Sequence, residues 1–105
     1  MEFKFNPDIL LEVPDLNTMI KFFKETLGFS VTKYTDSDMF EVKTQAVNFY
    51  IKESSDFRVI FDFLVDNQEQ AKEFLLKNDC SIYNWNGYDN HITHKNGFTF
   101  NVGKK

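Results

Sequence analysis

The sequence predicts an α+β fold built from two copies of one unit, each with a strand, a helix and three further strands. Three observations lead to this prediction. An amphipathic helix lies between two extended stretches near the N-terminus, a short polar link follows at residues 53–56, and the same order of patterns then begins again. The two expected modules span about residues 8–52 and 58–102 of a single 105-residue domain.

The stretch at residues 15–29, DLNTMIKFFKETLGF, predicts a complete helix with both ends marked. Asp15 is a good N-cap because its carboxylate can accept the amide protons of the first turn. Gly28 can adopt the left-handed conformation that closes the last turn. Apolar residues at helical spacing form one stripe that should be buried: Leu16, Met19, Ile20, Phe23 and Leu27.

Strands are expected on both sides of this helix. Residues 9–13 alternate between apolar and other positions, and Pro14 ends the stretch. Beyond Gly28, β-branched or aromatic residues recur at alternate positions in 29–34, 39–44 and 46–52, which predicts three more strands. A polar turn, TDSD at residues 35–38, separates the first two of these.

The second half repeats this order. A strand at 59–65 precedes a helix capped by Asp66 or Asn67, and Asn78 or Asp79 takes the place of Gly28 at the helix end. Three more strands are expected at 81–86, 88–94 and 98–102, with a type I′ hairpin at Asn96-Gly97. The inward positions of this second helix are Ala71, Phe74 and Leu75.

The strand at 59–65 has two alternative registers. With Asn67 as the cap, Phe61, Phe63 and Val65 pack on the helix and Asp62 faces away from it. Capping by Asp66 reverses this arrangement. We favour the first, because burying Asp62 against a helix without a partner would cost several kcal/mol; the opposite assignment remains open.

Composition and charge exclude several classes of function. The net charge of −4 and the lack of a basic cluster argue against nucleic-acid binding. No apolar stretch approaches the length of a membrane span, and the first residues, MEFKFNPD, do not resemble a secretion signal. The single cysteine excludes an internal disulfide framework. We therefore expect a cytoplasmic protein, with thirteen Phe and four Tyr building an aromatic core.

The segments ILLEVPDL, KFFKETLGF and HKNGFTFNV, set in two βαβββ modules, resemble the vicinal oxygen chelate superfamily. This superfamily groups glyoxalase I, the bleomycin-resistance proteins and the extradiol dioxygenases, and the resemblance covers residues 8–102. It implies that the modules form curled mixed sheets around a cavity, with the helices on the convex face. It also implies a homodimer.

The alternation of the strands indicates which side chains face the concave side. We expect a small-molecule site there, formed by Asp8, Glu12, Asn48, Tyr50, Asp62, Trp85 and Asn101. Glu12 and Asp62 are two inward carboxylates that, with aromatic rings, could hold a small cation. In the alternative interpretation both carboxylates lie at an open rim and are solvated.

Metal-using relatives in this superfamily place one ligand at each of four positions. The resemblance maps these positions onto Asp8, Tyr50, Val59 or Ile60, and Asn101. Only Asp8 is an ordinary metal ligand, and an apolar side chain cannot donate, so we expect no metal and no other cofactor.

Other chemically active side chains are isolated in the sequence. His91 and His94, three residues apart on a strand, point to opposite faces unless a bulge intervenes, so they cannot chelate one ion together. Cys80 has no neighbouring histidine and is expected to be a buried or half-buried spacer rather than a nucleophile. The aromatic residues of YNWNGY either cover the cavity, form a subunit contact or pack in the core.

Three functions therefore stand side by side. The first is a metal-free small-molecule binder of the glyoxalase and bleomycin-resistance type, sequestering a cationic or aromatic compound. The second is a metal-dependent lyase, isomerase or dioxygenase resembling glyoxalase I. The third is an interaction module without a ligand, its cavity filled by its own Phe side chains. Whether the protein is an enzyme stays open at this point.

Overall fold

The computed structural model describes residues 1–34 and 37–105, which form two compact units. Unit 1 consists of Met1–Asn6 and Ile60–Lys105, and unit 2 of Pro7–Val59. Each unit contains one helical segment and one sheet. The polar turn expected at residues 35–38 lies partly outside the described residues.

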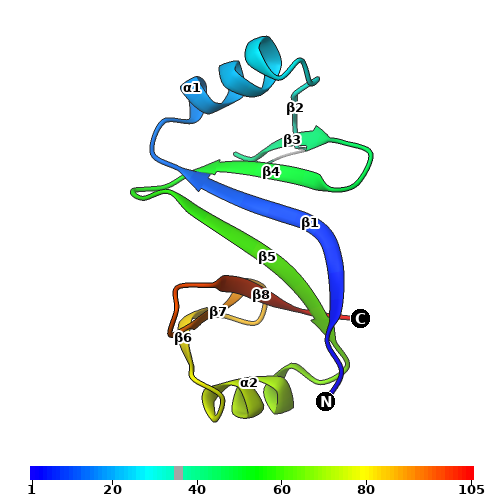
Figure 1. Ribbon diagram of the computed structural model, residues 1–105, viewed down its shortest axis with the longest axis vertical. Coiled ribbons are helices and arrows are strands. Elements are labelled where there is room, and N and C mark those ends of the chain that lie inside the picture. Colours follow the sequence, from blue (N-terminus) through cyan, green and yellow to red (C-terminus); the bar gives the residue numbers. More distant parts are fainter. Residues whose placement is uncertain (35–36) are drawn as a thin grey trace. The chain divides into compact units, whose positions relative to one another are not determined.

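Unit 2 has the order strand, helix, three strands (Figure 1). Its sheet has the strand order β2-β3-β4-β1, in which β1 runs parallel to β4 and the other pairs are antiparallel. A helical segment, α1 continued by the π-helix η1, covers one face of the sheet and contacts β4. The elements are β1 (Lys4–Val13), α1 (Leu16–Lys21), η1 (Phe22–Thr26), β2 (Thr32–Lys33), β3 (Phe40–Lys43) and β4 (Asn48–Glu53).

Unit 1 repeats the same topology. Its sheet has the order β5-β8-β7-β6, with β5 parallel to β8, and α2 packs on one face against β6 and β8. The α+β fold predicted from the duplicated pattern is therefore confirmed. The elements are β5 (Arg58–Val65), α2 (Gln68–Leu76), β6 (Cys80–Trp85), β7 (Asn90–His94) and β8 (Thr99–Lys104).

Each unit buries the sheet face that meets its helix. In unit 2 the alternate residues of β1 are buried, as predicted, and Phe23 packs on Phe49 with ring centroids 5.5 Å apart. The rest of this core includes Ile9, Leu11, Val13, Val42 and Ile51. In unit 1 the core cluster consists of Val65, Ala71, Leu75, Ile92, Phe100 and Val102. The sheet faces opposite the helices are thereby left to carry polar side chains.

The first helix departs from the predicted α-helix after Lys21. Asp15 caps it as expected, accepting the Thr18 amide proton at 3.1 Å. In η1 the Leu27 amide donates to Phe22, five residues back. Because a π turn contains more residues than an α turn, Leu27 rotates off the expected stripe and is 47% exposed, whereas Phe23 is buried.

The strand predicted at residues 29–34 is only two residues long. Gly28 has a φ of +80°, and the Phe29 amide turns back to donate to the Phe23 carbonyl at 2.9 Å. Residues 29–31 therefore complete the exit from the helix rather than joining the sheet. Likewise β4 begins at Asn48, because Thr44 and Val47 close a turn through their backbone groups and the Thr44 hydroxyl.

In unit 1 the open choice of helix cap is resolved. The Asn67 side chain accepts the Gln70 amide proton at 3.0 Å, and Phe61, Phe63 and Val65 pack on the helix side. The register favoured from the sequence is thus confirmed. Two of the three inward positions of α2 are buried, but Phe74 is exposed and lies beside Phe3.

In the second module, the turn after α2 follows one of the two predicted alternatives, whereas the hairpin between β7 and β8 differs from the predicted type. Asp79, not Asn78, holds the left-handed position after α2, with a φ of 63°. The hairpin at Asn96-Gly97 exists, but the type I′ prediction was wrong, because only Gly97 has positive φ. The Gly97 amide bonds to His94 and His94 to Phe98, which makes a longer loop that ends in a left-handed glycine.

None of the helices in the described part of the chain is both long and apolar enough to cross a membrane.

Candidate functional site

Polar side chains of unit 2 gather on the sheet face opposite α1. In the parallel pairing of β1 and β4, Asp8 lies opposite Asn48 and Leu10 opposite Tyr50. The Asn48 amide donates to the Asp8 carboxylate at 3.2 Å. Because the intervening residues of β1 are buried under the helix, alternation places Asp8 and Glu12 on this second face, as predicted.

Tyr50 is the centre of this face. Its hydroxyl donates to Glu41 on β3 at 3.0 Å, and the exposed Tyr34 ring meets the Tyr50 ring edge-on at 5.4 Å. Burial of the phenol, the hydrogen bond to Glu41 and the nearby negative charge of Asp8 raise the pKa of Tyr50 to about 12. Tyr50 therefore stays neutral at physiological pH, hydrogen-bonded to Glu41 and within the electrostatic influence of Asp8.

Glu12 lies on the same strand but has a partner of its own. Its carboxylate pairs with Arg58 at 3.3 Å, and its side chain is only 13% exposed. Glu12 is therefore neither a solvated residue at a rim nor a carboxylate open to a cation, the two alternatives expected from the sequence. Glu12 is held in a half-buried ion pair within unit 2.

In unit 1 the carboxylate of Asp62 occupies the corresponding face. It accepts two amide hydrogen bonds, from Asn6 at 2.7 Å and from Asn101 at 2.8 Å. Asn101 lies opposite Asp62 in the β5–β8 pairing, and its own oxygen accepts the backbone proton of Asn90 at 3.0 Å. Both ends of the Asn101 amide are therefore used in hydrogen bonds within the sheet.

The hydrogen bonds of Asn101 decide whether a metal ion could bind at this face of the sheet. The Asn101 oxygen already accepts a hydrogen bond and its nitrogen already donates one, and Ile60 is a buried apolar residue. Neither residue therefore supplies a metal ligand at the positions that the resemblance indicated. Within residues 1–34 and 37–105, no three His, Cys, Asp or Glu side chains lie close enough to hold a metal ion. The donor set therefore does not fit the metal that the resemblance implies.

The two histidines remain on opposite faces of β7. A bulge does interrupt the β6–β7 pairing, but it lies in β6, between Ile82 and Asn84. His91 is buried, pairs with Asn101 and has the Tyr83 ring stacked parallel to it at 6.3 Å. His94 lies at the hairpin, where its ring nitrogen accepts the Asn96 amide proton. His91 therefore lies on the same sheet face as Asp62 and Asn101, on the next strand, β7.

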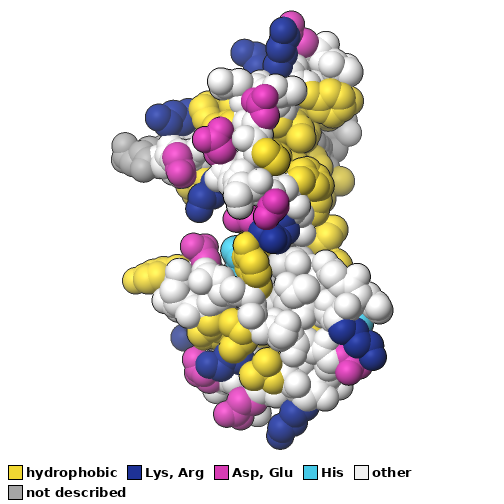
Figure 2. All heavy atoms as spheres, turned by 90° about the vertical axis from the view of Figure 1, so that its left-hand side faces the viewer, with side chains coloured by type: hydrophobic (Ala, Val, Ile, Leu, Met, Phe, Trp, Pro, Cys, Tyr) yellow, Lys and Arg dark blue, Asp and Glu magenta, His cyan; other side chains and the backbone are white. Residues whose placement is uncertain are grey.

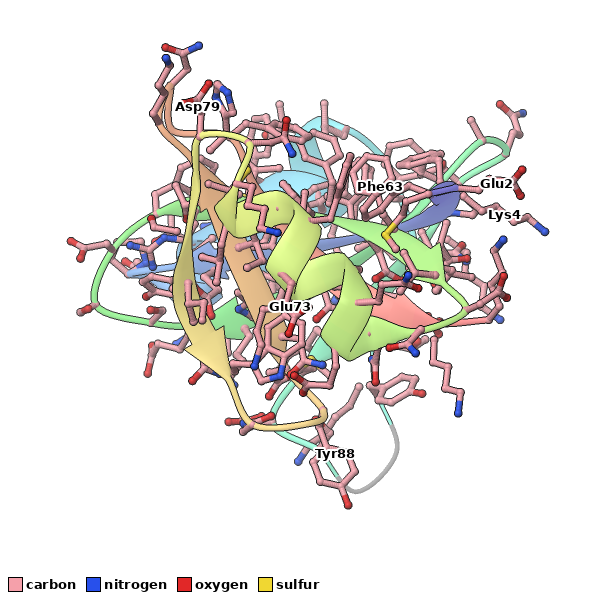
Figure 3. All side chains as sticks on the ribbon, turned by 90° about the horizontal axis from the view of Figure 1, so that it is seen from below. Glu2, Lys4, Phe63, Glu73, Asp79 and Tyr88 are labelled. Atoms are coloured by element: carbon pink, nitrogen blue, oxygen red, sulfur yellow. The ribbon has the colours of Figure 1, made fainter. Side chains whose placement is uncertain are left out.

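Trp85 does not lie on the face that carries Asp62. It packs on the helix side against the core of unit 1, with the Lys72 ammonium 5.0 Å above its ring. It also lines a cavity of about 280 Å³ at the N-terminus of α2. Figure 3 shows Tyr88 at the far tip of the β6–β7 loop, pointing into solvent, while Asp79 marks the opposite end of β6.

Cys80 has the environment of an unreactive thiol. Burial, and after it the negative charge of Asp79, raise the pKa of Cys80, so the thiolate is disfavoured at neutral pH. The Cys80 sulfur contacts the Asn78 carbonyl at 3.4 Å. This agrees with the expectation that Cys80 is a spacer rather than a nucleophile.

Unit 2 also has an apolar groove on its helix side. Figure 2 shows hydrophobic side chains gathered on the surface of this unit, in the upper part of the view. The groove measures about 430 Å³ and contains one carboxylate, that of Asp15, which caps α1. It can accept an apolar group but offers no reactive chemistry. Its wall is formed by Val13, Pro14, Asp15, Thr18, Met19, Phe22 and Phe57.

Several solved structures share this fold. A glyoxalase/bleomycin resistance protein/dioxygenase superfamily member from Vibrio splendidus 12B01 aligns over 97% of this chain and 100% of its own, with a TM-score of 0.67 and 16% identity. An extradiol ring-cleaving dioxygenase from B. fuscum aligns over 99% of this chain, with a TM-score of 0.67 and 15% identity. This chain spans 33% of the length of that dioxygenase.

A hypothetical protein from Bacillus halodurans C-125 aligns over 100% of this chain and 96% of its own, with a TM-score of 0.62 and 10% identity. No protein-family model matches the sequence, and no curated protein matches it significantly. The similarities to solved structures establish the fold, which is that of the vicinal oxygen chelate superfamily, as the sequence pattern indicated.

Sequence reasoning missed four residues of these faces: Glu41, Tyr34, Asn6 and Arg58. Glu41 carries a usable signal, because it alternates with the apolar Phe40 and Val42 and so must face the same side as Tyr50. Asn6 and Arg58 carry none. Their partners, Asp62 and Glu12, lie 56 and 46 residues away in the sequence.

Proposed function

We propose that this chain is a metal-free small-molecule-binding protein of the glyoxalase and bleomycin-resistance type, which takes a cationic or aromatic compound. The arrangement around Tyr50 carries this proposal. A cation near Tyr50 would meet the negative charges of Asp8 and Glu41 and the ring faces of Tyr50 and Tyr34. Aromatic rings backed by carboxylates are a common way to hold an organic cation.

The state of the other polar residues supports binding rather than catalysis. Asp62 accepts two hydrogen bonds and Glu12 is engaged in an ion pair, so both carboxylates already have partners within the chain. The misfit of Ile60 and Asn101 to the superfamily's ligand positions supports a metal-free state. The site then works by shape and charge, without a reacting group of its own.

An NMR titration of the full chain with benzyltrimethylammonium tests the proposal, because this probe combines a fixed positive charge with a ring. We expect saturable shifts of the amides around Glu41 and Tyr50. Tetramethylammonium and benzyl alcohol, each with half of the probe's chemistry, should bind more weakly. No saturable shift near Tyr50 with any of the three would contradict the proposal.

Glu41→Gln removes the charge but retains an oxygen that can accept the Tyr50 proton. It should weaken the affinity for benzyltrimethylammonium roughly three- to fivefold, the effect of one partly exposed charge. The matched control is Glu73→Gln, with the same charge change on the outer face of α2 (Figure 3). Equal weakening by both variants would indicate a general charge effect rather than a site.

Elemental analysis of the purified protein distinguishes a metal-free binding protein from the alternative, a metal-dependent enzyme. A stoichiometric transition metal would overturn the metal-free assignment and favour a lyase, isomerase or dioxygenase. If neither a metal nor a probe binds, the interaction module becomes the better description. The homodimer implied by the resemblance stays a prediction, which analytical ultracentrifugation measures directly.

A further inference from the structure

A second cavity lies in unit 1, on the helix side of the sheet, where the N-terminus of α2 approaches the β6–β7 loop. It measures about 280 Å³, close to the lower end of the range for small-molecule sites. None of its residues belongs to the face around Tyr50. The wall is formed by Asp66, Asn67, Gln68, Glu69, Trp85, Gly87, Asn90 and Lys104.

Asn90 is the unusual residue of this wall. It is 1% exposed, and its side-chain oxygen accepts the Gly87 amide proton at 2.9 Å, which fixes the orientation of the amide group. Its Nδ2 nitrogen is also buried and has no acceptor among the described residues. Buried donors are nearly always paired in folded proteins, so this donor calls for an acceptor atom from outside the chain.

Residues of the first turn of α2 also line this cavity. Asn67 caps the turn by accepting the Gln70 amide proton, and the Ala71 amide bonds to the Asn67 carbonyl. Gln68 and Glu69 precede these residues, and amides at those positions have no acceptor within a helix. Because α2 is nine residues long, its N-terminus also carries the partial positive charge of the helix dipole.

The cavity is lined by the carboxylates of Asp66 and Glu69 and by the ammonium of Lys104, and both carboxylates have cationic neighbours. Glu69 pairs with Lys72 at 2.9 Å. Asp66 lies 3.9 Å from the Lys105 ammonium, which also pairs with Glu2 at 3.2 Å. The hydrogen bond from Lys72, with a smaller one from the Trp85 indole, lowers the pKa of Glu69. Lys104 has no ion pair within the described residues, so its charge is not compensated.

We propose that this cavity binds a small organic oxyanion, a carboxylate or a phosphate monoester, with an apolar or aromatic group against Trp85. The ligand's oxygen accepts from Asn90 Nδ2 and from the first-turn amides, Lys104 balances its charge, and the indole face covers its apolar part. This site is independent of the cation site around Tyr50.

Trp85 is the single tryptophan of the chain, so its fluorescence reports directly on this cavity. The full chain is titrated at constant ionic strength with benzoate, phenyl phosphate, inorganic phosphate and benzyl alcohol. We expect saturable changes with benzoate or phenyl phosphate, weaker binding of inorganic phosphate, and none of benzyl alcohol. The ratio of the benzoate and phenyl phosphate affinities identifies the preferred oxyanion.

Two variants test the assigned residues. Lys104→Gln should weaken the affinity for the tighter probe roughly three- to fivefold, and the matched control Lys77→Gln, at the opposite end of α2, should leave it unchanged. Asn90→Asp keeps an acceptor for Gly87 but replaces the orphan donor with a negative oxygen, and should abolish binding. Circular dichroism confirms that the Asn90→Asp variant is folded.

Three results would overturn the oxyanion site. They are no saturable change with either aromatic anion, equal affinity for benzoate and benzyl alcohol, or equal weakening by Lys104→Gln and Lys77→Gln. Because the cation titration reads amides around Tyr50 and this one reads Trp85, failure of one leaves the other intact.

Discussion

The side-chain amide of Asn101 donates to the Asp62 carboxylate at 2.8 Å, and its oxygen accepts the Asn90 backbone proton at 3.0 Å. One residue thus bridges β5 and the start of β7 from its place on β8. Asn101, the residue onto which the resemblance maps a metal ligand, is thus a structural link of the sheet.

Replacing Asn101 should therefore destabilise the fold. Asn101→Ala leaves the Asn90 amide without its acceptor and removes one of the two donors to Asp62, so we expect the free energy of unfolding to fall by about 1–3 kcal/mol. Denaturant unfolding measures this. Asn17→Ala, on the exposed side of α1, is the control and should change the value by less than about 0.5 kcal/mol. Equal effects of the two variants would contradict the bridging role.

The raised pKa of Tyr50 makes stability depend on pH in the alkaline range. In the unfolded chain the phenol ionises near 10.0, whereas in the native state it ionises near 12. The stabilisation is complete below pH 10.0 and is lost as the pH rises to about 12. The free energy of unfolding should therefore fall more steeply over this range in the wild type than in Tyr50→Phe. Parallel pH profiles would show that Tyr50 is not perturbed.

The N-cap of α2 gives a direct test of the register of β5. Asn67→Ala removes the acceptor for the Gln70 amide and should cost about 1 kcal/mol of stability, whereas Asp66→Ala should cost less than about 0.5 kcal/mol. Thermal unfolding of both variants measures the difference. The reverse order would favour the alternative cap and the register that buries Asp62.

This register was predictable from the sequence because a single physical cost decides it, the burial of an unpaired Asp62. The helix caps, the buried faces of β1 and β5 and the repeat of the unit were predictable for similar local reasons. The partners of Asp62 and Glu12 were not, because Asn6 and Arg58 reach them only through the pairing of distant strands. The π-helix η1 was not predictable either, because the apolar residues of this segment fit the spacing of a continuous α-helix.

The two left-handed residues after the helices should respond to mutation in opposite directions. Gly28 has a φ of +80° and Asp79 a φ of 63°, in equivalent places of the two units. Gly28→Ala introduces a Cβ into this conformation and should cost about 1 kcal/mol. Asp79→Gly relieves the same strain and loses only an exposed ion pair with Lys95, so stability should not fall. Differential scanning calorimetry of both variants measures this, and destabilisation by Asp79→Gly would contradict the argument.

The ion pair of Glu12 with Arg58 gives Glu12 a role in the stability of unit 2, and we expect Glu12 to contribute little to ligand binding. Because both side chains are mostly buried, at 13% and 26% exposure, their coupling should exceed that of a surface pair and reach about 1 kcal/mol. A double-mutant cycle with Glu12→Gln and Arg58→Gln measures this coupling through denaturant unfolding. If Glu12 is engaged by Arg58 in this way, Glu12→Gln should change the affinity for benzyltrimethylammonium by less than about twofold. A coupling energy near zero would contradict the structural role of the ion pair. A large loss of affinity for benzyltrimethylammonium in Glu12→Gln would place Glu12 in the binding site with Glu41.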